Sequence, residues 1–147
     1  MASYADRKDN IVTLFNRKKL RPAVDDSTRL ASGDIPATVY FVMPDGTEFP
    51  VDTGSEIVLG RQPRADDPPV TVDVEAFDGH DLGVSRHHAM IKHIKDNLVL
   101  VDLDSINGTF INGRRAMPLK RYNLLDGDTI TLGRLTLEIR FAQRNRR

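Results

Sequence analysis

The 147-residue chain contains no cysteine and no tryptophan. Without cysteine it has no disulfide, no thiol nucleophile and no zinc–thiolate site, and this is compatible with a cytoplasmic protein. Its 21 basic and 21 acidic side chains leave no net charge, so a general attraction to nucleic acid or to a membrane is not expected. No run approaches the roughly 20 apolar residues that span a bilayer, and residues 1–10 hold no signal-peptide core. We therefore expect a cytoplasmic protein that binds neither nucleic acid nor membrane.

Residues 1–37 differ in composition from the rest of the chain. Within residues 6–20, Ile11, Leu14 and Phe15 fall near one face of a short helix that Pro22 would end. Residues 23–36 are rich in Asp, Ser, Thr, Gly and Pro, which is the composition of a flexible linker. We expect a flexible, partly helical N-terminal tail; the alternative is a disordered leader that has no role.

From residue 38 onward the chain alternates short β-prone runs with turn sequences. Asn112-Gly113 favours a type I′ hairpin, whereas Arg114 and Arg115 indicate a solvated charged turn or the flank of a peptide groove. Residues 64–83 form a long connection with a short strand at 70–74. Many short strands predict an all-β sandwich over residues 38–141, before a basic C-terminal end at 142–147. The expected strands are 38–43, 47–51, 56–59, 88–94, 98–103, 109–112, 129–132 and 135–141.

Polar motifs stand at the ends of these runs. In chain order they are Gly60-Arg61, Ser85-Arg86-His87-His88, Asn107-Gly108-Thr109 and Asn112-Gly113. This series resembles the forkhead-associated (FHA) domain family, whose members bind phosphothreonine peptides, and the resemblance covers roughly residues 38–141. It implies an FHA-type β-sandwich of two antiparallel sheets and a phosphopeptide-binding function.

The resemblance also implies roles for individual residues. Arg61 would bind the phosphate, and its planar fork of donors suits two phosphate oxygens. Ser85 would donate its hydroxyl, and Arg86 would add a positive charge or contact the peptide. Asn107 would hydrogen-bond the peptide backbone beside the phosphothreonine, because an amide both donates and accepts.

Three further residues of these motifs would support the site. His88 would brace the loop, while its neighbour His87 points to the other face of the strand and lies at the surface. Gly60 would support the site as the glycine of the Gly60-Arg61 pair, and Gly108 permits positive φ and close backbone approach. Ile106 departs from the family pattern, which often has a threonine there. The missing hydroxyl bond is worth on the order of 1 kcal/mol, so affinity is lower unless Arg86 compensates.

Two other site types are excluded by spacing. Asp102, Asp104 and Asn107 suggest a calcium loop, but the third ligand comes one position late and Gly113 stands where glutamate is needed. Ser85 and His88 lack the strained Gly-x-Ser-x-Gly elbow of a catalytic serine. We expect no enzyme activity, no metal and no cofactor.

The tail suggests regulation. Some bacterial FHA proteins carry a phosphorylated threonine on their own tail, and Thr28 (Thr13 as second choice) stands in a similar position here. We expect a Ser/Thr kinase to phosphorylate it, so that the tail competes with a phosphothreonine-containing partner protein. The alternatives are a phosphate-independent interaction domain of the same fold, and the regulatory N-terminal part of a larger signalling enzyme.

Overall fold

The computed structural model of this protein describes residues 35–142. The expected tail helix, Thr13 and Thr28 lie outside the described residues, and so does the expected basic end at 142–147 apart from Ala142. Within residues 35–142, no helix has the length and hydropathy of a bilayer-spanning segment.

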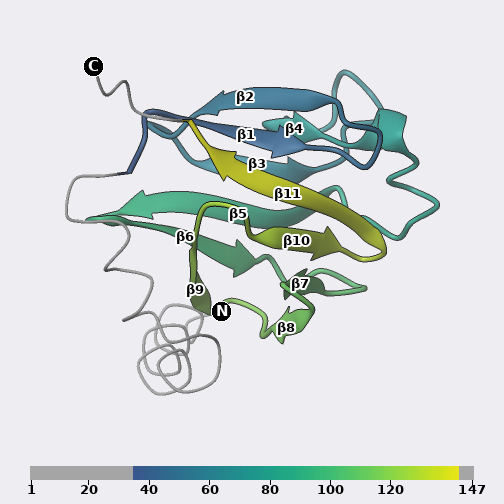
Figure 1. Ribbon diagram of the computed structural model, residues 1–147. Coiled ribbons are helices and arrows are strands. Elements are labelled where there is room, and N and C mark those ends of the chain that lie inside the picture. The colour runs from purple at the N-terminus through teal and green to yellow at the C-terminus, as the bar shows by residue number, and fades with distance from the viewer. Residues whose placement is uncertain (1–34, 143–147) are drawn as a thin grey trace.

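Strands of the described region form two sheets that pack face to face (Figure 1). The first sheet has the order β2 (Glu48–Asp52), β1 (Thr38–Val42), β11 (Leu135–Phe141), β10 (Thr129–Leu132), β7 (Thr109–Ile111) and β8 (Arg114–Ala116). The second has the order β4 (Val72–Asp73), β3 (Ile57–Gly60), β5 (His87–Ile94), β6 (Asn97–Asp102) and β9 (Arg121–Leu124). Neighbouring strands are antiparallel except β3 and β4, which pair in parallel. The predicted all-β sandwich is confirmed, with that one parallel pair as an addition.

The core lies between the two sheets and follows the two-residue period of β-strands. Along β11 the buried residues alternate with exposed or half-buried ones, and β6 is buried from Leu98 to Asp102. Each fully buried aliphatic or aromatic side chain contributes about 1.5–3 kcal/mol. This packing fixes the strand ends from which the loops emerge. The largest fully buried side chains are Phe41, Ile57, Leu59, Ile91, Leu98, Leu100, Ile111, Leu124, Ile130, Leu132, Leu135 and Leu137.

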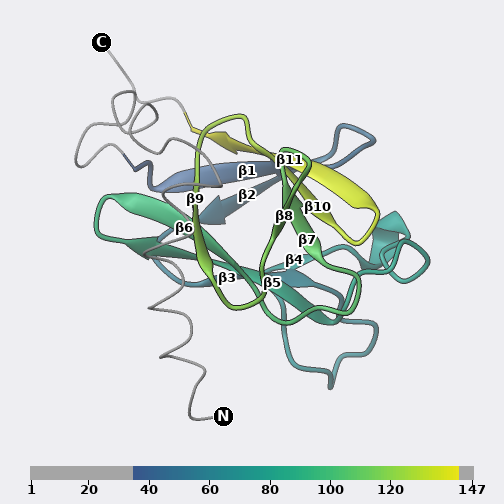
Figure 2. The ribbon, with the colours of Figure 1, turned by 90° about the horizontal axis from the view of Figure 1, so that it is seen from below.

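Several loops gather at one end of the sandwich, on the right in Figures 1 and 2. Gly133 and Arg134 form the turn between β10 and β11, and their backbone N–H groups donate to Gly108 O (2.9 Å) and Leu82 O (2.8 Å). The 3₁₀ helix η2 (Glu75–Phe77) lies at the same end. The loops brought together there span residues 61–71, 78–86 and 103–108.

Two strands were not predicted. Arg114 and Arg115 lie in β8, which pairs with β7 through a turn where Asn112 and Gly113 both have positive φ, 52° and 84°. The type I′ prediction is therefore confirmed, whereas the charged-turn prediction for the two arginines was wrong. Pairing with β7 outweighs the weak strand propensity of a short polar segment.

Strand β9 also depends on its tertiary contacts. Its pairing with β6 places Tyr122 opposite Leu100, and the Tyr122 ring is 3% exposed. The hydroxyl accepts a hydrogen bond from Met117 N at 2.9 Å. Burial raises the pKa of Tyr122 above its usual value.

Candidate functional site

Arg61 follows directly on the bulged end of β3. Its side chain is 13% exposed, and its NH1 nitrogen pairs with Glu75 Oε1 at 3.0 Å. Its Nε donates to Val84 O at 2.7 Å, and its backbone N–H donates to Arg86 O at 2.9 Å. A guanidinium carries five N–H donors, so these two side-chain bonds fix its plane and leave donors for an anion.

A glycine is required at position 60 because the end of β3 lies very close to the backbone of Arg86. A Cβ at Gly60 would lie 1.9 Å from the carbonyl oxygen of Arg86. The pairing of β3 with β5 shifts register between Leu59 and Gly60. A bulge of this kind turns the following side chain, here that of Arg61.

Ser85, Ile106 and Asn107 meet across two loops. Ile106 N donates a long hydrogen bond to Ser85 Oγ, at 3.4 Å. Asn107 Nδ2 donates to Gly83 O at 2.9 Å. The structure therefore brings Ile106 and Asn107 beside the 83–86 segment, which contains Ser85. Carbonyl groups of the same segment accept hydrogen bonds from Arg61.

His88 links these two loops through hydrogen bonds from its buried ring. It is completely buried; its Nδ1 accepts from Ser85 N at 3.0 Å and its Nε2 bonds to Gly108 O at 2.8 Å. A backbone N–H and a carbonyl as partners require the neutral tautomer that is protonated on Nε2. Burial lowers the pKa of His88, opposed by the Gly108 hydrogen bond and the nearby Asp102 carboxylate. His87 is exposed, as the alternation of strand residues predicted.

The 103–108 loop is organised by a residue that sequence analysis considered only as a calcium ligand. The carboxylate of Asp102, 1% exposed, accepts from Ser105 N (3.1 Å), Ser105 Oγ (2.6 Å) and Thr109 Oγ1 (2.6 Å). Ser105 Oγ in turn accepts from Gly108 N at 3.0 Å. This network presents Ile106 and Asn107 at the loop tip. Asp102, Ser105 and Glu75 were missed as organising residues because no motif spacing marks them.

Arg86 does not converge with the others through its side chain. Its NH1 nitrogen pairs with Asp67 at 3.3 Å, and the Arg86 side chain is 60% exposed. The guanidinium therefore lies toward the 61–71 loop. Only the Arg86 carbonyl contacts Arg61.

Ile106 is the most exposed large hydrophobic residue of the described region, at 86%. The Asp102 network sets its backbone, and no core contact holds its side chain. Its N–H and its apolar surface both remain at the tip of the site.

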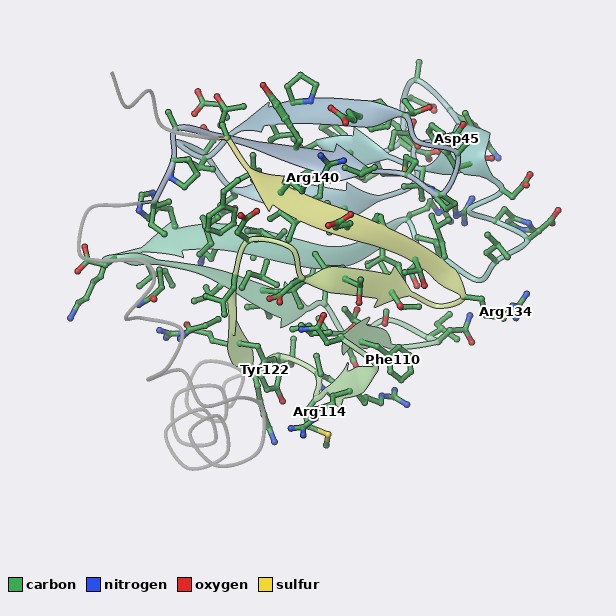
Figure 3. All side chains as sticks on the ribbon, in the orientation of Figure 1. Asp45, Phe110, Arg114, Tyr122, Arg134 and Arg140 are labelled. Carbon is green, nitrogen blue, oxygen red and sulfur yellow. The ribbon has the colours of Figure 1, made fainter. Side chains whose placement is uncertain are left out.

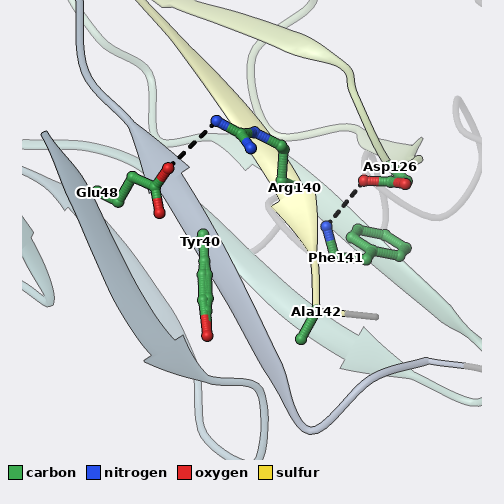
Figure 4. Close-up of a pocket in the computed structure, with 6 residues that line it drawn as sticks. All are labelled: Tyr40, Glu48, Asp126, Arg140, Phe141 and Ala142. Atoms are coloured by element: carbon green, nitrogen blue, oxygen red, sulfur yellow. Dashed lines mark hydrogen bonds and ion pairs between the residues drawn. The ribbon is translucent and has the colours of Figure 1, made fainter. Parts of the chain in front are cut away.

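A hollow lies away from these loops, on β1, β2, β11 and the turn between β9 and β10 (Figure 4). In it Arg140 NH2 pairs with Glu48 Oε2 at 3.3 Å, and Asp126 Oδ1 accepts from Phe141 N at 2.8 Å. None of the residues of the four polar motifs lines this hollow, so we do not place the functional site there.

Comparison with known proteins gives partial matches to longer chains. An FHA domain-containing protein of Arabidopsis thaliana is 34% identical over 92 residues, 63% of this chain and 22% of that protein. FraH of a Nostoc species is 41% identical over 66 residues, 45% of this chain and 22% of FraH. FhaA of Mycobacterium tuberculosis is 40% identical over 60 residues, 41% of this chain and 11% of FhaA. The chain thus spans 22% or less of these relatives.

Solved structures match over more of the described fold. The solution structure of an FHA domain from an Arabidopsis thaliana hypothetical protein has a TM-score of 0.62 and 29% identity, covering 80% of this chain and 96% of that one. An FHA domain studied for phosphothreonine-dependent interactions has a TM-score of 0.57 and 28% identity, covering 73% and 99%. The FHA domain family model matches residues 57–133, more than half of the sequence. This chain therefore belongs to the FHA domain family.

Proposed function

We propose that this FHA domain is a signalling module that binds phosphothreonine-containing segments of other proteins. The observation that carries the proposal is the meeting of Arg61, Ser85 and Asn107 around one four-residue segment, 83–86. The similarity to an FHA domain with phosphothreonine-dependent interactions supports it.

The chemistry of the site suits a phosphate dianion. A phosphorylated threonine carries nearly two negative charges and three strong acceptor oxygens near neutral pH. Arg61 offers its remaining guanidinium donors, Ser85 its hydroxyl and Ile106 its backbone N–H, whose present 3.4 Å bond is long and easily replaced. These groups recognise an anion and leave its bonds intact.

Asn107 suits the peptide backbone. One amide hydrogen is engaged with Gly83 O, which orients the side chain. The amide oxygen and the second hydrogen remain to accept from and donate to a peptide group. A phosphorylated segment would then be fixed at its phosphate by Arg61 and at its main chain by Asn107.

The test is binding of a labelled phosphothreonine peptide library to the full chain, followed by fluorescence anisotropy. Arg61→Ala should abolish phosphate-dependent binding, and unphosphorylated peptides should not bind. Arg140→Ala is the matched control, since that exposed arginine lines the hollow on β1, β2 and β11, away from the site (Figure 4). If the folded wild-type protein binds no phosphopeptide, this proposal is replaced by the alternative function, that of a phosphate-independent interaction domain.

We also propose that the tail is one ligand of this site, after a Ser/Thr kinase phosphorylates Thr28 or, as second choice, Thr13. Val39 pairs with Phe141, so β1 begins at the end of β11 that is farther from the site, about 20 Å along the strand. Thr28 precedes Thr38 by ten residues, which extend to roughly 33–36 Å at most. Because this maximum reach exceeds the distance along the strand, phosphorylated Thr28 can reach its own site.

Mass spectrometry of kinase-treated protein tests this regulation. Phosphate on Thr28 or Thr13, together with weaker binding of an external phosphopeptide, is expected. Arg61→Ala protein, phosphorylated in the same way, separates occupation of the site from other effects of the tail. Absence of tail phosphothreonine would remove the proposal. For this regulation by a Ser/Thr kinase we place the domain in the cytoplasm. It acts there alone or as the regulatory part of a larger signalling enzyme.

A further inference from the structure

Arg115 presents a guanidinium beside the turn that carries Asn107. Its Cζ lies 3.0 Å from the position that a Cβ on Gly108 would take, and 5.8 Å from the centroid of the Phe110 ring. The side chain is exposed, and among residues 35–142 no carboxylate pairs with it. Stacking on the ring and packing on the glycine therefore hold a cation without neutralising it.

Arg134 lies on the turn between β10 and β11, which contacts the 103–108 loop. Its NH2 nitrogen donates to the carbonyl oxygen of Asp81 at 2.6 Å. The turn that carries it is tied to the site loops, because Gly133 N donates to Gly108 O at 2.9 Å. Figure 3 shows Arg134 and Phe110 at the same end of the molecule. The partner of Arg134 is a neutral carbonyl, so its charge is also uncompensated.

Two acidic side chains at this end are paired with other arginines. Glu75 pairs with Arg61 and Asp67 with Arg86. The Asp81 carboxylate lies 3.6 Å from His80 Nδ1. Asp78, Asp81 and Asp104 remain as exposed acids in the loops at this end. Among residues 35–142 none of the three forms an ion pair with Arg115 or Arg134, so both guanidinium groups keep donors for an anionic ligand.

We propose that Arg115 and Arg134 select phosphothreonine segments that carry a second anionic group. This inference rests on the proposed function and names the chemistry of the ligand. A guanidinium binds a carboxylate or a phosphate through two parallel hydrogen bonds. Arg115 is already oriented by Phe110 and Gly108, so little conformational entropy is lost when the anion binds. The anion is the carboxylate of Asp or Glu, or a second phosphate group.

A substitution walk distinguishes these sources. One phosphothreonine peptide is synthesised with Ala, Asp, Glu or phosphoserine at each flanking position in turn. Fluorescence anisotropy then gives the affinity of the full chain as wild type, Arg115→Gln, Arg134→Gln and Arg140→Gln. At an exposed pair we expect an acidic residue at one or two positions to tighten binding about two- to fivefold. The gain should shrink as salt is raised.

The variants decide the assignment. Arg115→Gln or Arg134→Gln should remove the gain and leave phosphate-dependent binding intact, while Arg140→Gln keeps both. A larger gain from phosphoserine than from Asp or Glu identifies phosphate as the second anion. If the wild-type walk is flat, or the gain survives in both variants, this inference is overturned and the proposed function stands. If folded protein binds none of the phosphopeptides, both fall together.

Discussion

The guanidinium of Arg61 is held by the carboxylate of Glu75, with 3.0 Å between NH1 and Oε1. Glu75 comes from η2 and Arg61 from the end of β3, so two separate elements set the arginine's orientation. The same carboxylate places a negative charge beside the proposed phosphate position. Glu75 thus orients the arginine and also repels the anion, and these two effects can be separated by mutation.

Glu75→Gln keeps an oxygen that accepts from Arg61 and removes the charge. We expect phosphothreonine peptides to bind about two- to fivefold more tightly, because Glu75 is partly exposed and its repulsion is screened. Anisotropy titrations at low and high salt measure the change, which should be smaller at high salt. Glu75→Ala is the control, since it removes the orienting bond as well and should not gain. Weaker binding by Glu75→Gln would mean that orientation outweighs repulsion.

His88→Ala should destabilise the fold. The substitution leaves Ser85 N–H and Gly108 C=O without their buried partner and opens a cavity beneath the site. We expect a loss of about 2–4 kcal/mol in the free energy of unfolding. Urea denaturation measures it, with His87→Ala as the exposed neighbour that should stay within about 0.5 kcal/mol of wild type. Equal effects of the two variants would contradict the bracing geometry.

Stability should also fall in mild acid because of His88. Burial lowers its pKa in the folded protein, so below the unfolded value of about 6.5 the unfolded chain binds more protons. The neutral imidazole's contribution is complete above that pH and is lost as pH falls toward the lowered folded pKa, by at most about 1.4 kcal/mol per pH unit. Urea titrations between pH 7.5 and pH 5 measure the slope. His88→Gln should have a shallower slope, and identical slopes would refute the assignment.

Most strands could be predicted from the sequence because each depends on local chemistry, whereas the site residues were named from the resemblance to a family. The Asn112-Gly113 turn needs two positive φ angles, and β11 alternates buried and exposed residues along its length. Such patterns are visible without knowledge of the partner strand.

Features set by distant residues could not be predicted. Strands β8 and β9 form on pairing with β7 and β6, which outweighs their weak local preference. Glu75 and Asp67 lie in the long 64–83 connection, and only the fold shows that they pair with Arg61 and Arg86. The expectation that Arg86 adds a positive charge or contacts the peptide stays a prediction, and its pairing with Asp67 places the side chain toward the 61–71 loop.

Gly83→Ala and Gly113→Ala form a matched pair. Both glycines have φ of +84°, so the backbone strain, about 1–2 kcal/mol, is shared. A Cβ at Gly83 would lie 2.6 Å from Asn107 Nδ2, whereas at Gly113 nothing lies within 4 Å. We expect both to lower stability, but only Gly83→Ala to displace Asn107 and weaken phosphopeptide binding. Peptide titration beside urea denaturation tests this, and equal binding by the two variants would contradict the role of Asn107.

Ile106→Thr should strengthen phosphopeptide binding. The side chain is 86% exposed, so the change removes no core packing and stability should stay within about 0.5 kcal/mol. The new hydroxyl stands beside an N–H that the proposed phosphate uses, and one added hydrogen bond is worth on the order of 1 kcal/mol, or about fivefold in affinity. Ile106→Val is the control, because valine has the shape of threonine without the hydroxyl. Equal affinity of the two variants would show that this side chain does not face the phosphate, and equal losses in both would show that Ile106 contacts the peptide through its apolar surface.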